Sequence, residues 1–280
     1  MDWEEACARV ALMPQERDSI GKLSEKTIHA VCKFYREPDE RLHEVRVEGL
    51  VADVCREDGS IVEVQTRNFD RLREKLTRFL PEHEVEVVYP LPARKQIIWM
   101  AEDGTLGEPR LSPKRGRHTD ACYELWRIKE FLGDEHLTVR LLFIDVDEYR
   151  LLNGWSKDKK HGSTRVERIP GALREELLLR DLAEYEEAFV PELTFLGEFT
   201  AAEFQKENRM TKRLASYTIG FLREIGAVEK TGTRGRAYLY RRAGEMKESG
   251  TGEGAQDERC ETGNDVSAKQ EASAAGVRDE

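Results

Sequence analysis

Residues 47–66, VEGLVADVCREDGSIVEVQT, contain two runs of alternating apolar and polar residues joined by an acidic turn with a glycine. This pattern predicts two antiparallel strands connected as a hairpin. Glu63 and Gln65 are two residues apart, so their side chains point to one face of the second strand. The length of the hairpin loop decides whether Asp53 joins them on that face.

Two loop lengths are compatible with this stretch. A two-residue loop, Asp58-Gly59, sends Asp53 to the face opposite Glu63. A three-residue loop over residues 57–59, with Gly59 in the left-handed conformation, pairs Asp53 directly with Glu63. Like charges opposed across two strands repel each other, so this second register requires a positive partner. A divalent cation is the partner we expect, because hard cations take oxygen ligands.

The flanking sequence predicts a mixture of helices and strands. Glu25 falls on the apolar stripe of the first helix, three residues before Ile28 and seven before Cys32, so it needs a partner. We expect strands over residues 43–48, 50–55, 61–66, 85–89, 96–100 and 137–146, and helices over residues 24–36, 69–80, 119–132 and 172–189.

An acidic residue on a first helix, a hairpin that carries Asp, and Glu-x-Lys on the next strand form the pattern of the PD-(D/E)XK nuclease superfamily. Glu25, Asp53 and Glu63-Val64-Gln65 occupy these places, so about a quarter of the chain resembles that family. The resemblance implies an α/β fold with a restriction-endonuclease-like mixed sheet flanked by helices. It also implies Mg²⁺ or Mn²⁺ held by Asp53, Glu63 and Glu25, and metal-assisted phosphodiester hydrolysis.

Gln65 departs from that pattern, because the family usually has Lys at this place. An amide orients water by hydrogen bonds but brings no positive charge, so Gln65 is a candidate water-orienting catalytic residue. The alternative is that Asp53, Glu63 and Gln65 form the solvated face of an antiparallel sheet.

Residues 191–242 have the element order of a different module. Thr200-Ala201-Ala202-Glu203 is a capping box that begins a short helix. A second helix over residues 211–225 ends at Gly226, and a hairpin with its loop at residues 232–235 follows. This order resembles the winged helix-turn-helix family, which implies DNA contacts from the second helix and the wing. The implied residues are Lys212, Arg213, Ser216, Tyr217, Arg223, Arg234 and Arg236.

Charge is unevenly distributed along the chain, whose formal net charge is −10. Residues 205–242 contain ten Lys or Arg and three Glu, a net charge of +7. Residues 243–280 hold ten acidic and four basic residues and no aromatic residue, so we expect a disordered acidic tail. The basic module suggests a partner of opposite charge, such as nucleic acid.

Two further basic segments lie in the acidic body. Residues 109–118 contain Lys114, Arg115 and Arg117, which are candidates for phosphate contacts. Residues 156–168 contain the five cations Lys157, Lys159, Lys160, Arg165 and Arg168. We interpret both as loops, for which a purely solvated role is the alternative. The acidic residues Asp145, Asp147 and Glu148 are interpreted as surface or strand-end groups.

Several function classes are not favoured. No apolar run approaches the ~20 residues of a membrane span, and the acidic N-terminus lacks the features of a secretory signal. Five scattered cysteines argue against a disulfide framework or a zinc cluster, which favours a cytoplasmic location. No G-x-S-x-G or comparable triad motif is present.

We therefore predict a nuclease-like α/β domain over residues 20–150, a basic loop and linker helix over 151–190, a winged helix-turn-helix over 191–242 and a disordered tail over 243–280. The function that this order favours is a DNA-binding, metal-dependent nuclease acting on double-stranded DNA. One alternative is a transcriptional regulator whose degenerate nuclease-like domain serves ligand binding or homodimer formation. Another is a protein-interaction adaptor.

Overall fold

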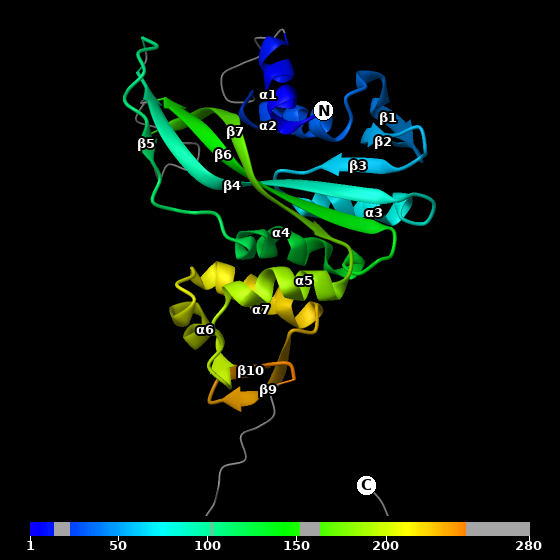
Figure 1. The fold of residues 1–280 in the computed structure, drawn as a ribbon. Helices are drawn as coiled ribbons and strands as arrows, with labels where there is room; N and C mark the ends of the chain where they lie inside the picture. The colour runs from blue at the N-terminus through cyan, green and yellow to red at the C-terminus, as the bar shows by residue number, and fades with distance from the viewer. Residues whose placement is uncertain (14–22, 102, 152–162, 245–280) are drawn as a thin grey trace, which may run out of the picture. The chain divides into compact units, whose positions relative to one another are not determined.

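A computed structural model describes residues 1–13, 23–101, 103–151 and 163–244, and for residues 23–26 it describes the backbone alone (Figure 1). Within these ranges, helices lie on both faces of a mixed β-sheet, and shorter helices and strands follow toward the C-terminus. The predicted mixed α/β class is confirmed. None of the helices in these ranges is both long and apolar enough to cross a membrane. The predicted disordered tail lies outside the described residues from residue 245 onward.

The described part of the chain forms a seven-stranded sheet in the order β1-β2-β3-β4-β6-β7, with β5 paired to β4. The β3–β4 and β4–β6 pairs are parallel and the other pairs are antiparallel. The strands are β1 (His43–Val47), β2 (Leu50–Cys55), β3 (Ile61–Val64), β4 (Val85–Met100), β5 (Arg110–Leu111), β6 (Leu137–Leu151) and β7 (Thr164–Leu179).

Strand β4 is continuous where two separate strands were predicted, although it contains Pro90 and Pro92. The carbonyl of Val88 accepts a hydrogen bond from the backbone N–H of Gln65, at 2.9 Å, so residues 88, 90 and 92 direct their backbone groups toward β3. Strand β3 ends one residue before Gln65. Proline has no backbone N–H to donate. Pro90 and Pro92 lie beyond the end of β3, so no acceptor of that strand is left without a hydrogen bond.

Helices α1 (Trp3–Leu12) and α2 (Leu23–Arg36) cover one face of the sheet, where Trp3 and Ile28 pack with Val62 and Leu142. No element was predicted before residue 24, although Asp2 and Glu5 form a capping box that marks the start of α1. The other face is covered by α3 (Leu72–Phe79), α4 (Cys122–Leu125) and the 3₁₀ turns η2 (Phe69–Arg71), η3 (His118–Ala121) and η4 (Trp126–Phe131).

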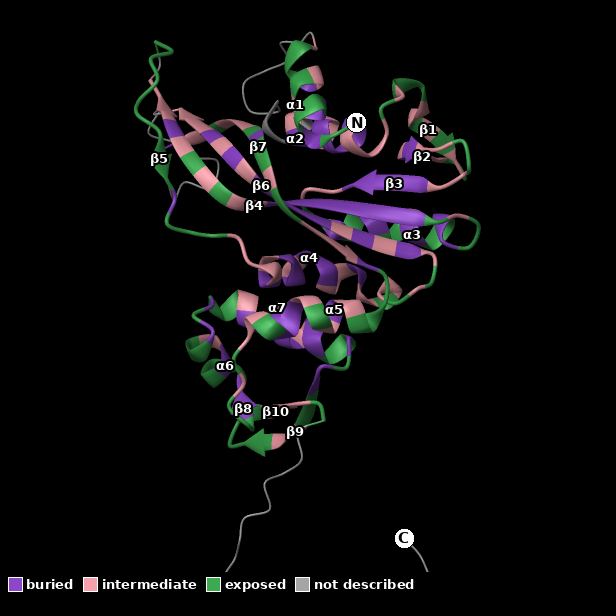
Figure 2. Ribbon diagram, viewed as in Figure 1, coloured by how far each residue is buried: buried purple, intermediate pink, exposed green. Residues whose placement is uncertain are grey.

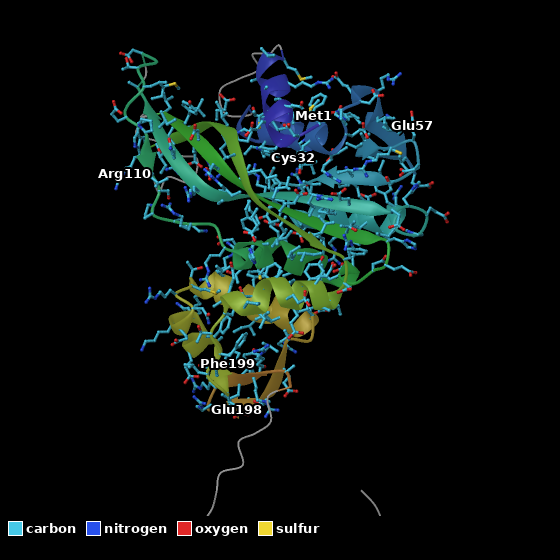
Figure 3. All side chains as sticks on the ribbon, in the orientation of Figure 1. Met1, Cys32, Glu57, Arg110, Glu198 and Phe199 are labelled. Atoms are coloured by element: carbon cyan, nitrogen blue, oxygen red, sulfur yellow. The ribbon has the colours of Figure 1, made fainter. Side chains whose placement is uncertain are left out.

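Burial follows this layered arrangement. Strand β3 and the first half of β4 are buried between the helical layers (Figure 2). Cys32 of α2 is fully buried, whereas Glu57 lies exposed at the β2–β3 loop (Figure 3). The helix predicted over residues 119–132 is broken into η3, α4 and η4, with non-helical backbone angles at Ile128.

The helix predicted over residues 172–189 is wrong for its first half. Residues 164–179 are strand β7, paired antiparallel with β6, and helix α5 (Leu182–Phe189) begins only after Asp181. The side chain of Asp181 accepts from the backbone N–H of Glu184 and caps that helix. The Leu-, Arg- and Glu-rich composition of residues 172–179 favours a helix locally. Pairing with β6 outweighs this preference because it satisfies the backbone hydrogen-bonding groups along that edge of β6. The main sheet therefore extends past residue 150, and its last strand occupies the place of the predicted linker helix.

The C-terminal elements follow the predicted order. Thr200 and Glu203 form the capping box, Thr211 caps the second helix, and Gly226 follows that helix with φ +78°. A three-stranded sheet in the order β8-β10-β9 completes this part. The elements after α5 are η5 (Val190–Glu192), β8 (Phe199–Thr200), α6 (Ala201–Glu207), α7 (Lys212–Glu224), β9 (Val228–Arg234) and β10 (Ala237–Arg242).

The predicted loop of the last hairpin is displaced. Arg234 pairs with Ala237, so the turn is Gly235-Arg236 rather than residues 232–235. Gly235 has φ +63°, which a two-residue hairpin turn requires and which glycine adopts without strain. Gly232 lies within β9 opposite Leu239, where the register shifts.

Candidate active site

The β2–β3 register places Asp53 beside Glu63. Val54 pairs with Val62 and Cys55 with Ile61, so the next pair along the hairpin is Asp53 and Glu63. The loop comprises residues 57–59, because the backbone N–H of Arg56 donates to the carbonyl of Ser60 at 2.9 Å. Gly59 has φ +84°. The three-residue loop is therefore confirmed, and the two-residue alternative is wrong.

The two carboxylates are close and largely removed from solvent. The side chain of Glu63 is 1% exposed and that of Asp53 is 18% exposed. The backbone N–H of Asp53 lies 3.4 Å from Oε1 of Glu63, and the backbone N–H of Val64 donates to Oδ2 of Asp53 at 2.8 Å. The purely solvated sheet face, offered above as an alternative, does not describe Glu63.

A positively charged side chain and a histidine contact the pair from two helices. Nζ of Lys75, on α3, lies 2.6 Å from Oε2 of Glu63. Nε2 of His29, on α2, lies 3.2 Å from Oδ2 of Asp53. We predicted neither contact. Lys75 lies one residue before the buried Leu76 on α3. Its place beside the apolar stripe of that helix is the sequence signal that could have identified it.

The environment shifts the pKa values of Asp53 and Glu63 in opposite directions. Burial, followed by the charge of Asp53, raises the pKa of Glu63 to about 7, although Lys75 opposes this. Burial acts in the same direction on Asp53, but His29, Lys75 and the N–H of Val64 outweigh it and lower the pKa of Asp53. The two carboxyl groups therefore differ in their tendency to ionise, with Asp53 the stronger acid.

Glu44 is a third carboxylate at this place, which the sequence analysis did not identify. The β1–β2 register places it across from Asp53. Its φ of 54° lies in the left-handed region, which is uncommon for Glu and costs energy. Its carboxylate accepts from Nζ of Lys33 at 2.9 Å.

These residues surround a pocket of about 590 Å³ between α2, the ends of β1–β3 and the start of α3. Asp53 and Glu44 line it together with His29 and Gln65. The cations that line it are Lys33, Arg67, Arg71 and Lys75. Glu63, which is buried, is not among the residues that line it. Carboxylates beside a cationic rim can bind a divalent cation and the phosphate group of a ligand together.

The other two predicted site residues have different outcomes. Gln65 lines the pocket, and its side-chain amide donates to the carbonyl of Arg67. The backbone of Glu25 is part of α2, one turn before His29, but its side chain lies outside the described residues.

The cations of residues 109–118 are mostly engaged within the protein. Lys114 pairs with Asp120 at 2.9 Å, and a guanidinium N–H of Arg115 donates to the carbonyl of Ser112 at 2.8 Å. Arg117 donates to the carbonyls of Asn208 and Glu192, at 3.0 and 2.9 Å. Arg117 therefore connects the main sheet region to the C-terminal elements instead of facing a ligand. In the second basic segment, Lys157, Lys159 and Lys160 lie outside the described residues.

One face of α7 packs on α4 and η4. Arg213 lies over the ring of Tyr123, 4.4 Å from its centroid, and Tyr217 contacts the same ring edge-on at 4.5 Å. One turn further, a Cβ on Gly220 would lie 3.3 Å from Trp126, so the helices approach closely there. This face includes two of the residues predicted to enter a DNA groove.

The remaining predicted DNA contacts are at the surface. Lys212, Ser216 and Arg223 are exposed on α7, and Arg236 is exposed at the β9–β10 turn. Arg234 pairs with Glu203 at 2.8 Å.

Comparisons with known proteins identify a family for this chain and one similar protein. Residues 26–180 match the family model described as "Domain of unknown function (DUF8091)", a range that includes Asp53, Glu63 and Lys75. A protein of Treponema pallidum (strain Nichols), recorded as "Uncharacterized protein", is 31% identical over 227 residues, which make up 80% of this chain and 88% of that protein. No solved structure matches the chain.

Proposed function

This chain belongs to the family of the domain of unknown function DUF8091, and from the geometry of its pocket we propose that it is a metal-dependent phosphodiester hydrolase that acts on nucleic acid, double-stranded DNA in the first place. The observation that carries the proposal is the direct opposition of Asp53 and Glu63 beside a pocket with a cationic rim. The order of α2, β1–β3 and α3 supports a restriction-endonuclease-like core.

The donor set suits Mg²⁺ or Mn²⁺. Both side chains offer hard oxygen atoms, and burial together with the charge of Asp53 raises the pKa of Glu63, a repulsion that a bound cation would relieve. In the described ranges no three His, Cys, Asp or Glu side chains form a group that could hold a metal ion, so the proposal assigns the cation two protein ligands, Asp53 and Glu63. Mg²⁺ is commonly bound by one or two carboxylates, with water and substrate phosphate as its other ligands.

Four residues in or beside the pocket have roles in this proposal. Asp53 and Glu63 hold the cation, which when bound polarises the phosphate and makes water more acidic. Lys75 supplies, from α3, the positive charge that Gln65 lacks. The amide N–H of Gln65 is engaged by Arg67, which leaves its carbonyl oxygen to orient the attacking water.

The C-terminal elements supply substrate binding in this proposal. The succession of α5, β8, α6, α7, β9 and β10 supports a winged helix-turn-helix module. Because Arg213 and Tyr217 contact Tyr123, we assign the phosphate contacts to Lys212, Arg223 and Arg236. A cytoplasmic location and a homodimer remain predictions.

The decisive experiment is cleavage of plasmid and single-stranded DNA with Mg²⁺ or Mn²⁺. We expect metal-dependent cutting by the wild-type protein and a loss of at least about 100-fold in Asp53→Asn and in Glu63→Gln. Even residues that only support metal ligands contribute about 10–100-fold. The matched control is Glu57→Gln, which removes an exposed carboxylate from the same hairpin and leaves the rate unchanged. Cutting that persists in both pocket variants contradicts the proposal.

A second candidate is a DNA-binding regulator without catalytic activity. The observation that favours it is that Lys75 and His29 already contact the two acids, while Gln65 replaces the expected Lys. For this candidate we expect no cutting, together with salt-sensitive DNA binding that Lys212→Glu combined with Arg223→Glu weakens at least about tenfold. DNA binding that this double variant leaves unchanged rules out the assigned contacts of α7.

A further inference from the structure

Four cations surround one buried carboxylate on the outer halves of β4, β6 and β7. The side chain of Glu148 has no exposed surface. Its oxygen atoms lie 2.5 Å from Arg150, 3.4 Å from Lys95, 3.3 Å from Arg165 and 3.0 Å from Arg168. We call these five residues the Glu148 cluster. The interpretation of Glu148 as a surface or strand-end group is therefore wrong.

The charges within the Glu148 cluster do not balance. Lys95, Arg150 and Arg168 alone bring three positive charges to one carboxylate. Burial acts to raise the pKa of Glu148, but Arg165, Arg168 and Lys95 lower it to about 2, so this single negative charge is permanent at neutral pH. Burial and Arg168 lower the pKa of Lys95 against the effect of Glu148. The cations therefore repel one another and attract an anion.

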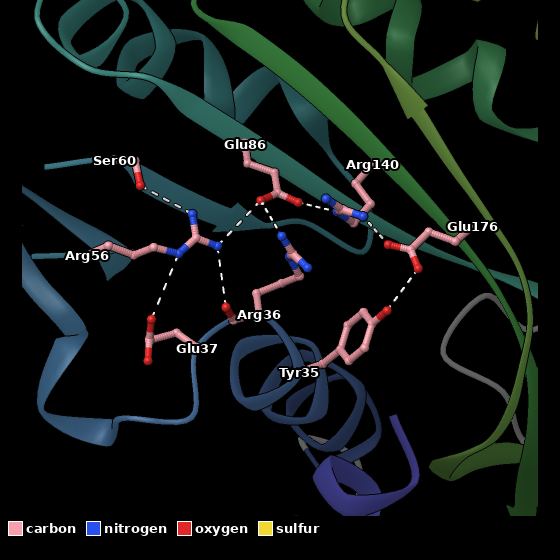
Figure 4. Close-up of polar contacts among 8 residues, drawn as sticks. All are labelled: Tyr35, Arg36, Glu37, Arg56, Ser60, Glu86, Arg140 and Glu176. Carbon is pink, nitrogen blue, oxygen red and sulfur yellow. Dashed lines mark hydrogen bonds and ion pairs between the residues drawn. The ribbon is translucent and has the colours of Figure 1, made fainter. Parts of the chain in front are cut away.

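A second arginine cluster in the same sheet shows what a structural network looks like here (Figure 4). It contains three arginines and three carboxylates, which alternate along a chain of ion pairs. Its members are Arg36, Arg56, Arg140, Glu37, Glu86 and Glu176. Among the described residues, the ion pairs of Lys95, Arg150 and Arg168 all join them to Glu148, so a structural role alone does not account for the composition of the cluster.

The cations of the Glu148 cluster are accessible to a ligand. Between 21% and 39% of each side chain is exposed. The guanidinium carbon of Arg150 lies 5.9 Å from the ring centroid of Trp99, which is itself partly exposed. Guanidinium groups bind phosphate oxygens in pairs, and an aromatic surface beside them suits a nucleotide chain better than a simple anion.

We propose that the Glu148 cluster binds the phosphodiester backbone of a nucleic-acid strand through its cations, with the phosphate competing with Glu148 for them. The assignment of this strand as the substrate of the Asp53–Glu63 pocket rests on the proposed function.

The position of the cluster relative to the pocket agrees with this assignment. Oγ1 of Thr27, on α2, donates to Glu167 of β7 at 3.3 Å, directly before Arg168 in the chain. Two residues further along α2, His29 contacts Asp53 in the pocket. Helix α2 lies between the β6–β7 arm and the β1–β2 hairpin (Figure 1). The cluster and the pocket therefore flank one helix, whose diameter with side chains is about 10–12 Å.

The test measures binding of a fluorescent single-stranded oligonucleotide to the full-length protein in EDTA, where no cleavage takes place. We expect Lys95→Gln combined with Arg168→Gln to raise the Kd at least about tenfold. The slope of log K against log salt should fall by about 1.4, because two phosphate contacts of a single strand are lost. The matched control, Arg78→Gln combined with Arg180→Gln, removes two cations from surface ion pairs and leaves both quantities unchanged.

A second variant keeps the test decisive if the first one unfolds. Glu148→Gln removes the competing carboxylate and keeps the cations, so the oligonucleotide should raise its Tm more than that of the wild-type protein. Equal Kd values for the wild type and the Lys95/Arg168 variant, or an equal rise in Tm with inorganic phosphate alone, overturn the proposal. If the wild-type protein cleaves DNA and the Lys95/Arg168 variant binds the oligonucleotide as tightly as the wild type, this binding site is contradicted but the proposed hydrolase is not. If the variant loses binding and the wild-type protein cleaves no DNA, the hydrolase is contradicted but this binding site is not.

Discussion

Replacing Glu86 with alanine is expected to lower the free energy of unfolding by about 3–5 kcal/mol, the cost of removing one partner from a buried ion network. Glu86 lies at the centre of the network in Figure 4, 3.0 Å from Arg36 and 3.5 Å from Arg56, and it also accepts from Arg140. Without it, three guanidinium groups face one another with only Glu37 and Glu176 left. Since Arg36 ends α2, the loss also removes an ion pair between that helix and the sheet.

The measurement is urea unfolding of the wild type, Glu86→Ala and Glu82→Ala at pH 7. Glu82 is an exposed carboxylate four residues earlier, and its replacement should change the free energy by less than about 0.5 kcal/mol. Burial acts to raise the pKa of Glu86, but Arg36 and Arg140 lower it overall, so its contribution is present at neutral pH and is lost as the pH falls through that lowered value. A loss below about 1 kcal/mol in Glu86→Ala would mean that the network is not needed for stability.

Replacing Glu63 with glutamine is expected to stabilise the metal-free protein at pH 8, although it removes an ion pair with Lys75. The pKa of Glu63 is raised from 4.5 to about 7 in the folded protein, chiefly by burial and by Asp53. Between these two values the folded state binds a proton that the unfolded state has released, so stability falls as the pH rises. Above pH 7 the full penalty applies, on the order of 3 kcal/mol, and Glu63→Gln avoids it.

The test compares the free energy of unfolding of the wild type and Glu63→Gln in EDTA at pH 4.5 and pH 8. The gain from the substitution should appear at pH 8 and be nearly absent at pH 4.5, and Glu57→Gln should show no such dependence. Adding Mg²⁺ at pH 8 should stabilise the wild type and leave Glu63→Gln unchanged, because a cation in the pocket relieves the same repulsion. A pH-independent difference between the two proteins would contradict the electrostatic account of this pair.

The candidate site could be predicted only in part. The alternation over residues 61–66 and the glycine of the hairpin loop are local signals. They limited the hairpin to two registers, one of which pairs Asp53 with Glu63 as in the structure. The neighbours of the pair come from elements distant in sequence. Lys75 and His29 contact the pair from different helices. Glu44 lies near the pair in a left-handed backbone conformation, which the residue pattern does not predict.

The sequence by itself determined the features that depend on neighbouring residues: strand alternation, the capping of α6 and α7 by Thr200 and Thr211, and the glycine that ends α7. Only the tertiary structure decided that residues 172–179 form a strand, that α7 packs against Tyr123, and that Glu148 is buried among cations. The physical reason is that each of these outcomes depends on a partner far away in the chain. An open strand edge, an aromatic face or an opposite charge changes the free energy of a segment only after the fold has brought the two together.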